Sequence, residues 1–553
     1  MIEAPNFPYG EVEDPRADLA FSTIPHLVDW AAATFGSDEA LVDGERRLSF
    51  IDLAAEVDEV ARGLMAAGLE RGDRVAMWAP NCAEWVLGAL GALRAGGVLV
   101  TLNTRYKGGE AAYIIRSAGA RWLMTVTGFL GSDFPAMLRG HELGQLDAIV
   151  LLRGGPAAAG PEGTTTIELA DLRARGAAVD PLRSAARSAE IDADDTADLI
   201  FTSGTTGNPK GAMTTHAQSL RTFGTWASIV GLRRGDRYLV VNPFFHTFGY
   251  KAGLLASLMA GATVIPEPVF DVDVVLDRIA EERVSMLPGP PTLYRSILSH
   301  PRRAEVDLSS LRLGVTGAAA VPVELVVAMR EELGFETVLT AYGLTESCGV
   351  VTMCRRDDPP ALISGTSGRA IPELEVAVVD KEGNERPRGE AGEVVVRGYP
   401  VMTGYFNDPE ATAETIDGSG WLHTGDIATM DEGGNLIITD RLKDMYVVGG
   451  FNAYPAEIEM MLRQFEGVSD VAVIGVPDER MGEVGCAYVV RSGGDRRSDE
   501  ALADELMAFA KEQMANYKLP RSVIVIGELP RNASGKVLKR DLREGHAASI
   551  NKL

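Results

Sequence analysis

Short runs rich in β-branched residues alternate with amphipathic stretches between residues 50 and 339. One such run, at residues 199–201, leads into a loop of small residues and then into an amphipathic stretch at residues 217–230. The same order returns at residues 311–315 and 323–333. This alternation predicts an α/β fold built from βαβ units with mostly parallel sheets. Because ligands bind such sheets at the loops that follow the strands, both loops are candidate walls of a site.

The pattern changes after about residue 440 to that of a smaller α+β unit. It predicts strands at residues 444–448, 471–476 and 486–490, and helices at residues 455–463 and 499–514. We therefore expect a large N-terminal body of stacked α/β layers over residues 1–440 and a C-terminal domain over residues 441–553. The N-terminal body is expected to carry a small β-barrel-like element near residues 391–397.

Two segments of the large body lack this alternation. Residues 153–166 are mostly glycine, proline and alanine, and residues 183–198 are charged and rich in alanine. Both are expected to be surface connectors without chemistry of their own.

The composition narrows the class of protein. With 46% hydrophobic and 24% charged residues, the 553-residue chain is an ordinary globular protein. Its 78 acidic and 53 basic residues give a net charge of −25, which disfavours nucleic acid and anionic membranes as partners. The four cysteines form no Cys-x-x-Cys pair, so neither a disulfide framework nor a thiolate zinc site is predicted. No secretory signal or membrane span is predicted, and we expect a cytoplasmic location.

The sharpest chemical signal is TSGTTGNPKG at residues 202–211, directly after a predicted strand. Glycine lets backbone N–H groups approach phosphate oxygens, and hydroxyl and ammonium groups add further donors. The spacing is not that of a Walker loop, and a flexible surface turn is the alternative interpretation. The residues expected to bind phosphate are Thr202, Ser203, Gly204, Thr205, Thr206, Gly207 and Lys210.

This loop and six further segments resemble, in the same order, the motifs of the adenylate-forming superfamily. That superfamily includes acyl-CoA synthetases, adenylation domains of peptide synthetases and luciferases. The segments are PFFH at 243–246, YGLTE at 342–346, GE and RG at 392–393 and 397–398, HTGD at 423–426, DRLKD at 440–444, and PRN and GK at 530–532 and 535–536. The likeness spans roughly residues 30 to 545.

The resemblance implies a reaction in two steps. A carboxylate attacks the α-phosphate of ATP to give acyl-AMP and pyrophosphate, and a thiol then captures the acyl group. Because two anions meet, the site needs cations and fixed dipoles, a role for Mg²⁺ and lysine. The implied partners are a carboxylic acid, ATP and CoA, while the formation of a homodimer is left open.

The resemblance also assigns roles to single residues. Lys536 would bridge the carboxylate and the α-phosphate, and Glu346, next to Thr345 in the YGLTE motif, would bind Mg²⁺. Asp426 and Arg441 would reach the ribose. The residues implied at the adenine are Tyr342, Gly343, Gly317 and Ala318, although the last two also suit tight strand–helix packing.

The C-terminal domain is expected to rotate between the two half-reactions. Lys443 occupies the hinge position of the superfamily and falls at the predicted domain border. The rotation would bring Gly449, Gly450 and Phe451 to the pantetheine of CoA. An ordinary hairpin turn is the alternative for these three residues.

The acyl pocket is expected to begin at His246, which would lie near the substrate carboxylate. The implied wall comprises Phe245, Phe248, Tyr250 and Lys251, and apolar walls with a few polar groups suit a hydrophobic acid. Lys251 is the unusual member. It either extends to solvent or contacts a polar group of the substrate.

Several runs around this wall look like a bacterial branch of ligases that activates the propionate side chain left on the C and D rings in steroid breakdown. That branch handles a bicyclic diketo acid, whose buried keto oxygen would need a donor such as Tyr250 or Lys251. The alternatives are a medium- or long-chain fatty acid as substrate and a carrier protein as acceptor. From other classes, a luciferase-like oxygenase and a nucleotide-binding regulator without catalysis are the further alternatives.

Overall fold

The computed structural model describes residues 19–154, 161–202, 209–317, 321–441, 444, 446–448, 451–453, 455–478, 481–514, 516–531 and 537–550. The chain divides into two compact units. Unit 1 comprises Met1–Gly317, Val321–Glu375 and Val396–Leu422, and unit 2 comprises Ala318–Ala320, Val376–Val395 and His423–Leu553. The domain border expected after residue 440 stays a prediction.

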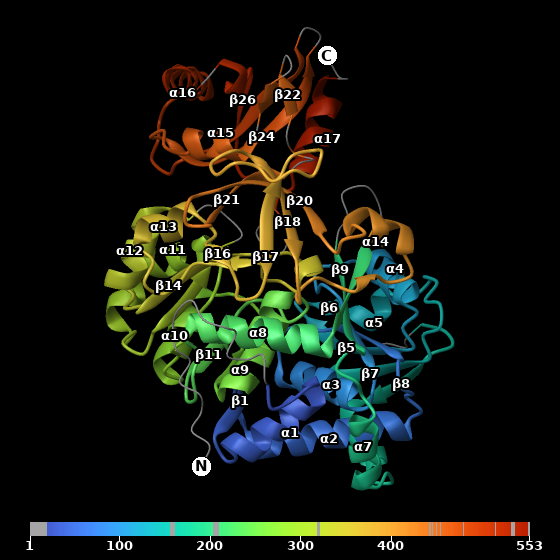
Figure 1. Ribbon diagram of the computed structural model, residues 1–553. Coiled ribbons are helices and arrows are strands. Elements are labelled where there is room, and N and C mark those ends of the chain that lie inside the picture. Colours follow the sequence, from blue (N-terminus) through green and yellow to red (C-terminus); the bar gives the residue numbers. More distant parts are fainter. Residues whose placement is uncertain are drawn as a thin grey trace. The chain divides into compact units, whose positions relative to one another are not determined.

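The described part of unit 1 contains a nine-stranded sheet (Figure 1). Its main path runs β19 (Gly404–Tyr405), β10 (Lys210–Thr215), β9 (Thr196–Thr202), β4 (Val98–Thr101), β3 (Arg74–Trp78), β5 (Trp122–Phe129), β7 (Ala148–Arg153) and β8 (Thr165–Glu168), and β6 (Ser132–Asp133) pairs with β5. From β9 to β8 the neighbours are parallel, whereas β10 is antiparallel to both β9 and β19. The expected mostly parallel sheet is confirmed, with an antiparallel hairpin at β9–β10.

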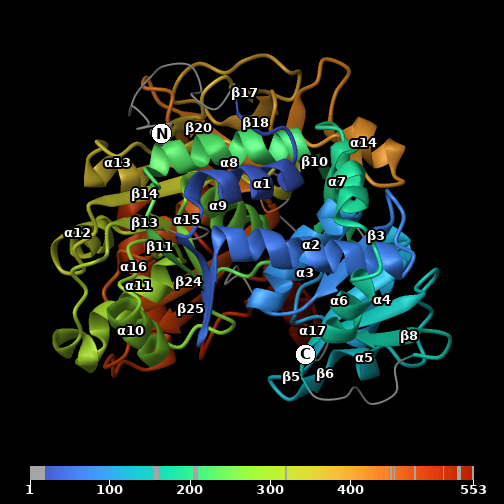
Figure 2. The same cartoon turned by 90° about the horizontal axis from the view of Figure 1, so that it is seen from below.

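Helices cover this sheet because their apolar stripes need a buried partner. Helix α2 (Phe50–Ala66) packs on α3 (Ala83–Arg94) and α6 (Leu169–Gly176), and α1 (Ile24–Phe35) packs against α2 and α3 (Figure 2). The predicted helix at 217–230 is confirmed as α8 (His216–Val230). A capping box fixes its start, since the Thr215 hydroxyl accepts from the Gln218 N–H and the Gln218 side chain accepts from the Thr215 N–H.

A second group of strands in unit 1 completes the α/β body. Its strands are β2 (Arg46–Ser49), β1 (Glu39–Asp43), β12 (Thr263–Pro266), β11 (Arg237–Val240), β13 (Leu313–Thr316), β14 (Thr337–Tyr342), β15 (Thr352–Met353) and β16 (Arg369–Ala370). Parallel bridges through Met286 join β11 to β13. The predicted strand at 311–315 and helix at 323–333 correspond to β13 and α12 (Val323–Glu331).

Much of the connector expected at residues 183–198 is regular secondary structure. Residues Pro181–Ala189 form helix α7, whose N-cap is Asp180, and β9 begins at Thr196. The Ser184 hydroxyl is buried and donates to Asp58 at 2.8 Å, so the helix is anchored to α2. Alanine and arginine are good helix formers, which explains why this charged, alanine-rich stretch is helical. Of the other connector, residues 155–160 lie outside the described residues.

A four-stranded sheet follows in the order β17 (Glu375–Val379), β18 (Gly392–Arg397), β20 (Leu422–Met430) and β21 (Leu436–Arg441). Near residues 391–397, where a small β-barrel-like element is expected, the structure has strand β18 of this four-stranded sheet. In the chain, helix α13 (Pro360–Gly365) precedes this sheet, and helix α14 (Pro409–Thr415) lies between β18 and β20.

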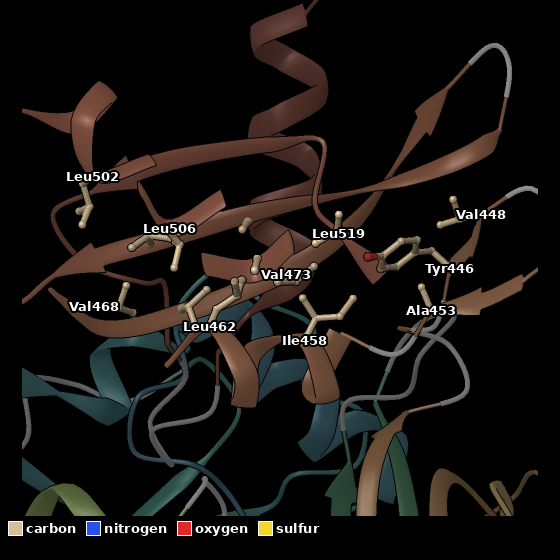
Figure 3. Close-up of a cluster of buried hydrophobic side chains, with 14 residues drawn as sticks. Tyr446, Val448, Ala453, Ile458, Leu462, Val468, Val473, Leu502, Leu506 and Leu519 are labelled. Atoms are coloured by element: carbon tan, nitrogen blue, oxygen red, sulfur yellow. The ribbon is translucent and has the colours of Figure 1, made fainter. Parts of the chain in front are cut away.

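The rest of unit 2 combines a sheet with helices, in line with the α+β fold expected for the C-terminal part of the chain. Its strands are β23 (Phe451–Ala453), β22 (Tyr446–Val448), β25 (Gly482–Arg491), β24 (Val468–Asp478) and β26 (Ser522–Ile526), and its helices are α15 (Pro455–Leu462), α16 (Asp499–Gln513) and α17 (Lys539–Ile550). Alternate residues of β24 face two separate cores. Val471 and Val473 join the cluster under α15 and α16 that Figure 3 shows, whereas Ala472 and Ile474 join the cluster that contains Leu542 of α17.

The four cysteines are buried free thiols. In the described part of the chain, no helix is both long and apolar enough to cross a membrane.

Candidate active site

The base of the predicted phosphate loop is a β-hairpin in unit 1. Thr202 ends β9 and lies opposite Lys210, the first residue of β10. A Cβ on Gly211 would lie 3.0 Å from the Phe201 ring, so glycine lets the two strands stay close there. Of the expected phosphate ligands, Ser203, Gly204, Thr205, Thr206 and Gly207 lie outside the described residues.

Glu346 lies directly beside this hairpin. Its Oε1 accepts from the Thr202 hydroxyl at 3.1 Å and from the Tyr405 hydroxyl at 2.9 Å. Its backbone carbonyl accepts from the Met402 N–H at 2.8 Å. The structure thus brings together two motifs, TSGTTG and YGLTE, whose residues are far apart in the chain.

Tyr405 is a site residue that the sequence reasoning missed. It lies on β19, next to β10, and the Lys210 ammonium lies 5.3 Å from the centre of its ring. Burial and the neighbouring Glu346 carboxylate raise the pKa of Tyr405, which keeps the hydroxyl protonated as a donor. In the sequence it is one tyrosine in a short GYF run, with no pattern that points to chemistry.

The YGLTE segment turns sharply between β14 and β15. A Cβ on Gly343 would lie 2.3 Å from the Gly349 carbonyl oxygen, so only glycine allows this close approach. Thr345 and Glu346 form a short 3₁₀ turn, η3 (Thr345–Ser347), which ends at Cys348 in the left-handed region with φ 56°. The turn therefore presents Glu346 from a tightly constrained backbone.

Two of the residues expected at the adenine, Tyr342 and Gly317, lie at the ends of neighbouring strands. Tyr342 is the last residue of β14, half-buried, and Gly317 follows the adjacent β13. A Cβ on Gly317 would make ordinary contact, 3.4 Å from the Ala341 carbonyl oxygen, so strand packing alone does not require glycine there. Ala318 lies outside the described residues.

His246 follows β11 in a loop that Asn81 fixes. The Asn81 amide donates to the carbonyls of Val240 and Asn242, both at 2.9 Å, and accepts from the Phe244 N–H at 2.7 Å. The His246 side chain is exposed, yet desolvation by the surrounding protein lowers its pKa. The lowered pKa favours the neutral imidazole at pH 7.

The expected acyl wall forms a π-helix, η1 (Phe248–Leu255). Such helices are rare and often occur at functional sites. Phe248 is half-buried and meets Trp226 edge to face at 6.3 Å, and the Phe245 carbonyl accepts from the Thr101 hydroxyl at 2.7 Å. Tyr250 is fully buried, and its hydroxyl has no hydrogen-bond partner among the described residues.

The expectation that Lys251 extends to solvent is wrong. Its side chain is 0% exposed, and its Nζ lies 3.0 Å from Oδ1 of the buried Asp198. Burial alone would lower its pKa, but the charge of Asp198 and the contact with Cys348 outweigh this and raise the pKa of Lys251. A buried partner carboxylate, which the sequence does not reveal, therefore replaces solvent.

In unit 2, two motifs named separately in the sequence also meet. Glu393 accepts from the Gly425 N–H at 3.0 Å and lies 2.9 Å from Nδ1 of His423. Gly425 adopts φ +66°, a region that favours glycine. This fixes the turn that presents Asp426, which is buried and pairs in register with Arg441 across β20–β21.

Four expected site residues of unit 2 lie outside the described residues: Lys443, Gly449, Gly450 and Lys536. The ends of the segment that carries Lys536 are held together. Arg531 and Val537 form an antiparallel bridge, and Lys539 lies 2.9 Å from the Glu459 carboxylate. Phe451 pairs in register with Val448 on neighbouring strands, β23 and β22.

The surroundings of Glu346 fit a hard cation such as Mg²⁺. Its carboxylate accepts hydrogen bonds from the hydroxyl groups of Thr202 and Tyr405, so the neighbouring groups are oxygen donors. Proteins often hold Mg²⁺ with one or two carboxylates plus substrate phosphates, rather than with a cage of several ligands. The described residues contain no cluster of three or more His, Cys, Asp or Glu side chains suited to a metal.

Comparison with known proteins identifies the family. Residues 28–406 match the model of the AMP-binding enzyme, and residues 457–536 match that of the AMP-binding enzyme C-terminal domain. The chain belongs to the AMP-binding enzyme family. This membership confirms the resemblance drawn from the motifs.

Two relatives align over almost their whole length. A protein of Rhodococcus jostii (strain RHA1) is 48% identical over 523 residues, which cover 95% of this chain and 98% of that protein. A protein of Mycobacterium tuberculosis (strain ATCC 25618 / H37Rv) is 47% identical, covering 94% and 98%. Both are named 3-[(3aS,4S,7aS)-7a-methyl-1,5-dioxo-octahydro-1H-inden-4-yl]propanoyl:CoA ligase.

A solved structure shares the fold. The anthranilate CoA ligase AuaEII in complex with anthranoyl-AMP is 29% identical, with a TM-score of 0.83 over 95% of this chain and 98% of that chain. The α/β fold class with a smaller C-terminal domain is thereby confirmed. The predicted enzyme class, an AMP-forming acyl-CoA ligase, is confirmed by the family and by its relatives.

Proposed function

We propose that this AMP-forming ligase activates the propionate side chain of a bicyclic diketo acid and transfers the acyl group to CoA. The observation that carries the proposal is the similarity, at 47% and 48% identity over nearly the whole chain, to two relatives named for such an acid. The reaction class follows from the family, so the proposal concerns the acid and the roles of single residues.

In unit 1, Thr202, Lys210 and Glu346 would hold the phosphates of ATP. We call the β9–β10 hairpin, which carries the predicted phosphate loop, the phosphate hairpin. Lys210 is the first residue of β10 in this hairpin, where its ammonium would offset phosphate charge. Glu346 and the Thr202 hydroxyl would hold Mg²⁺, which when bound neutralises negative charge on the phosphates. Tyr405 would orient the Glu346 carboxylate by donating to Oε1.

His246 would lie against the substrate carboxylate. Its Nδ1 accepts from the Phe248 N–H at 3.4 Å, which leaves the proton of the neutral ring on Nε2. A neutral donor orients the carboxylate without neutralising it, so the carboxylate keeps its nucleophilic charge. The lowered pKa of His246 supports this role because it holds the ring neutral at pH 7.

The π-helix would form the wall for the acid. The edge-to-face contact of Phe248 with Trp226 gives a rigid apolar surface, which suits a saturated fused ring. The Tyr250 hydroxyl is a buried donor without a partner among the described residues, and a buried keto oxygen would supply the missing acceptor. Both features support a keto-bearing ring substrate over a plain alkyl chain.

In unit 2, the roles come from the superfamily motifs. Asp426 and Arg441, which are register partners on β20 and β21, would bind the ribose. Lys536 would stabilise charge as the acyl–phosphate bond forms, and Lys443 would be the hinge. Gly449, Gly450 and Phe451 would line the path of the CoA thiol.

A competition experiment tests the substrate proposal. The enzyme is given ATP, Mg²⁺, CoA and an equimolar mixture of the bicyclic diketo propionate, octanoate, palmitate and benzoate, and the acyl-CoA products are quantified by mass spectrometry. Product ratios report ratios of kcat/KM directly. We expect the bicyclic acyl-CoA to dominate; dominance of octanoyl- or palmitoyl-CoA would refute the proposal in favour of a fatty acid ligase.

A further inference from the structure

The ammonium of Lys251 is enclosed by protein acceptors at the centre of unit 1. Besides Asp198 at 3.0 Å, it donates to the Thr214 hydroxyl at 2.6 Å and contacts the Cys348 sulfur at 3.5 Å. The Thr214 hydroxyl in turn donates to Asp198 at 2.5 Å. An ammonium has three N–H donors, so these three partners account for all of them. We refer to these four residues as the Lys251 cluster.

Each member of the Lys251 cluster belongs to a different part of the site. Asp198 and Thr214 are register partners on β9 and β10, the two strands that carry Thr202 and Lys210. Cys348 closes the turn that presents Glu346. Lys251 itself lies in the π-helix that follows His246. The cluster therefore ties the acid-binding wall to the phosphate hairpin and to the metal-binding turn.

Stability alone gives little reason to keep such a cluster. Moving charges out of water is unfavourable, and well-packed apolar residues of similar size are often equally or more stabilising than a buried ion pair. The Lys251 and Asp198 side chains are only 0% and 1% exposed, so they bear this penalty in full. What an ion pair provides beyond an apolar contact is direction, because its hydrogen bonds fix the geometry of the groups they join.

Direction matters here because the reaction joins two bound groups. A carboxylate held by one part of the site must approach an α-phosphate held by another, and a misplacement of about 1 Å can reduce the rate about 100-fold. We propose that Lys251 is a positioning residue that holds the acyl-binding π-helix in register with the phosphate hairpin and the Glu346 turn. Because protein partners take up all three N–H donors of Lys251, this role replaces its expected place in the pocket wall. The inference rests on the proposed use of these segments for acid and ATP.

The test is a paired neutral variant, K251M/D198N, in the full-length enzyme. It removes both charges, so neither is left buried and unpaired. We expect it to fold, with kcat for pyrophosphate release lowered about 10-fold or more and the KM values for ATP and acid changed less than about 3-fold. A loss confined to kcat is the signature of lost orientation, whereas a loss confined to KM would make Lys251 a binding group and overturn the proposal.

A second buried ion pair of unit 1 supplies the matched control. Arg312 and Asp236 form an ion pair whose side chains are 8% and 5% exposed, and Asp236 also accepts from the Ser285 hydroxyl at 2.8 Å. R312M/D236N should leave kcat within about 2-fold of the wild type. An equal fall of kcat in both paired variants would show that the loss of any buried ion pair in unit 1 slows the enzyme, and it would overturn the proposal.

Milder variants keep the test decisive if K251M/D198N does not fold. Thr214→Val and Cys348→Ala each remove one partner of the ammonium and leave the ion pair intact. We expect each to lower kcat about 3- to 10-fold at unchanged KM, and unchanged kcat in both would overturn the proposal. If the wild type released no pyrophosphate with any acid, the proposed function would fail together with this inference; an active wild type with unaffected variants would overturn the inference alone.

Discussion

Two ion pairs, one in each unit, hold segments that adjoin the expected catalytic groups, but their surroundings differ. In unit 1 the side chains of Lys251 and Asp198 are 0% and 1% exposed. In unit 2, Arg543 of α17 lies 2.7 Å from Asp444, and these side chains are 36% and 15% exposed. The first pair joins the π-helix to strand β9 of the β9–β10 hairpin, and the second joins α17 to the DRLKD segment.

This difference in burial changes what each pair contributes. A pair in contact with water gains little, because solvent already stabilises both charges and salt screens them. A buried pair fixes its neighbours rigidly, but either charge alone is very unfavourable. We therefore expect the free energy of unfolding to fall sharply, and independently of salt, when the pair in unit 1 is broken, and to fall little when the pair in unit 2 is broken.

The largest effect is expected for Lys251→Met. It leaves the Asp198 carboxylate buried without its ammonium, which should lower the free energy of unfolding by about 3–5 kcal/mol. Urea denaturation at low and high salt measures this change, which should not depend on salt. A loss below about 1 kcal/mol would show that the pair of Lys251 and Asp198 contributes no more to stability than a surface ion pair.

Next comes Lys536→Ala in unit 2, which should act on rate rather than on stability. The loss of a group that stabilises the developing charge should slow acyl-AMP formation about 10²- to 10³-fold. Thioester formation from supplied acyl-AMP should stay near the wild-type rate. Lys511→Ala, on the exposed side of α16, is the control and should change neither step. Equal losses in both half-reactions would contradict the role of Lys536.

The third effect is a loss of stability in acid, caused by buried His216 of unit 1. Desolvation lowers its pKa from 6.5 to about 4. The unfolded chain therefore takes up the proton first, so stability is full above about pH 6.5 and falls by roughly 3 kcal/mol as the pH drops to about 4. His216→Gln keeps an acceptor for the Ile24 N–H and should flatten this part of the stability curve. An unchanged slope would rule out His216 as its source.

A smaller effect is expected for Tyr405→Phe, which removes one donor to Glu346. Groups that orient a metal ligand typically change metal affinity about 10- to 100-fold, and we expect the lower end because Thr202 still donates. The measurement is the Mg²⁺ concentration that gives half-maximal pyrophosphate release. The control is Tyr399→Phe, because the Tyr399 hydroxyl donates to Thr225 rather than to Glu346. This variant should leave the half-maximal Mg²⁺ concentration unchanged.

The smallest effect is expected for Arg543→Met. Because the Arg543 side chain is 36% exposed, its pairing with Asp444 should contribute at most about 1 kcal/mol, and less at high salt. Thermal unfolding at two salt concentrations measures it. A large, salt-independent loss of stability would show that this exposed pair contributes as much as the buried pair of unit 1.

The sequence predicted much of the fold because periodicity and loop chemistry are local signals. The strand at 199–201, helix α8 and the elements around β24 and β25 were all found in this way. The resemblance implied that Thr202 binds phosphate and that Glu346 binds Mg²⁺, but it did not give their hydrogen bond. Tyr405 comes close to Glu346 through the pairing of β19 with β10, which the sequence does not reveal. The partner of Lys251 could not be predicted either, because a long cationic side chain defaults to solvent unless a distant carboxylate is buried beside it.

The most direct test of the whole account labels the acid. The bicyclic diketo propionate is prepared with ¹⁸O in its carboxylate and given to the wild-type enzyme with ATP, Mg²⁺ and CoA, and the products are analysed by mass spectrometry. If the carboxylate attacks the α-phosphate, AMP gains one ¹⁸O while the acyl-CoA forms. Unlabelled AMP, or formation of ADP with labelled phosphate, would contradict the account.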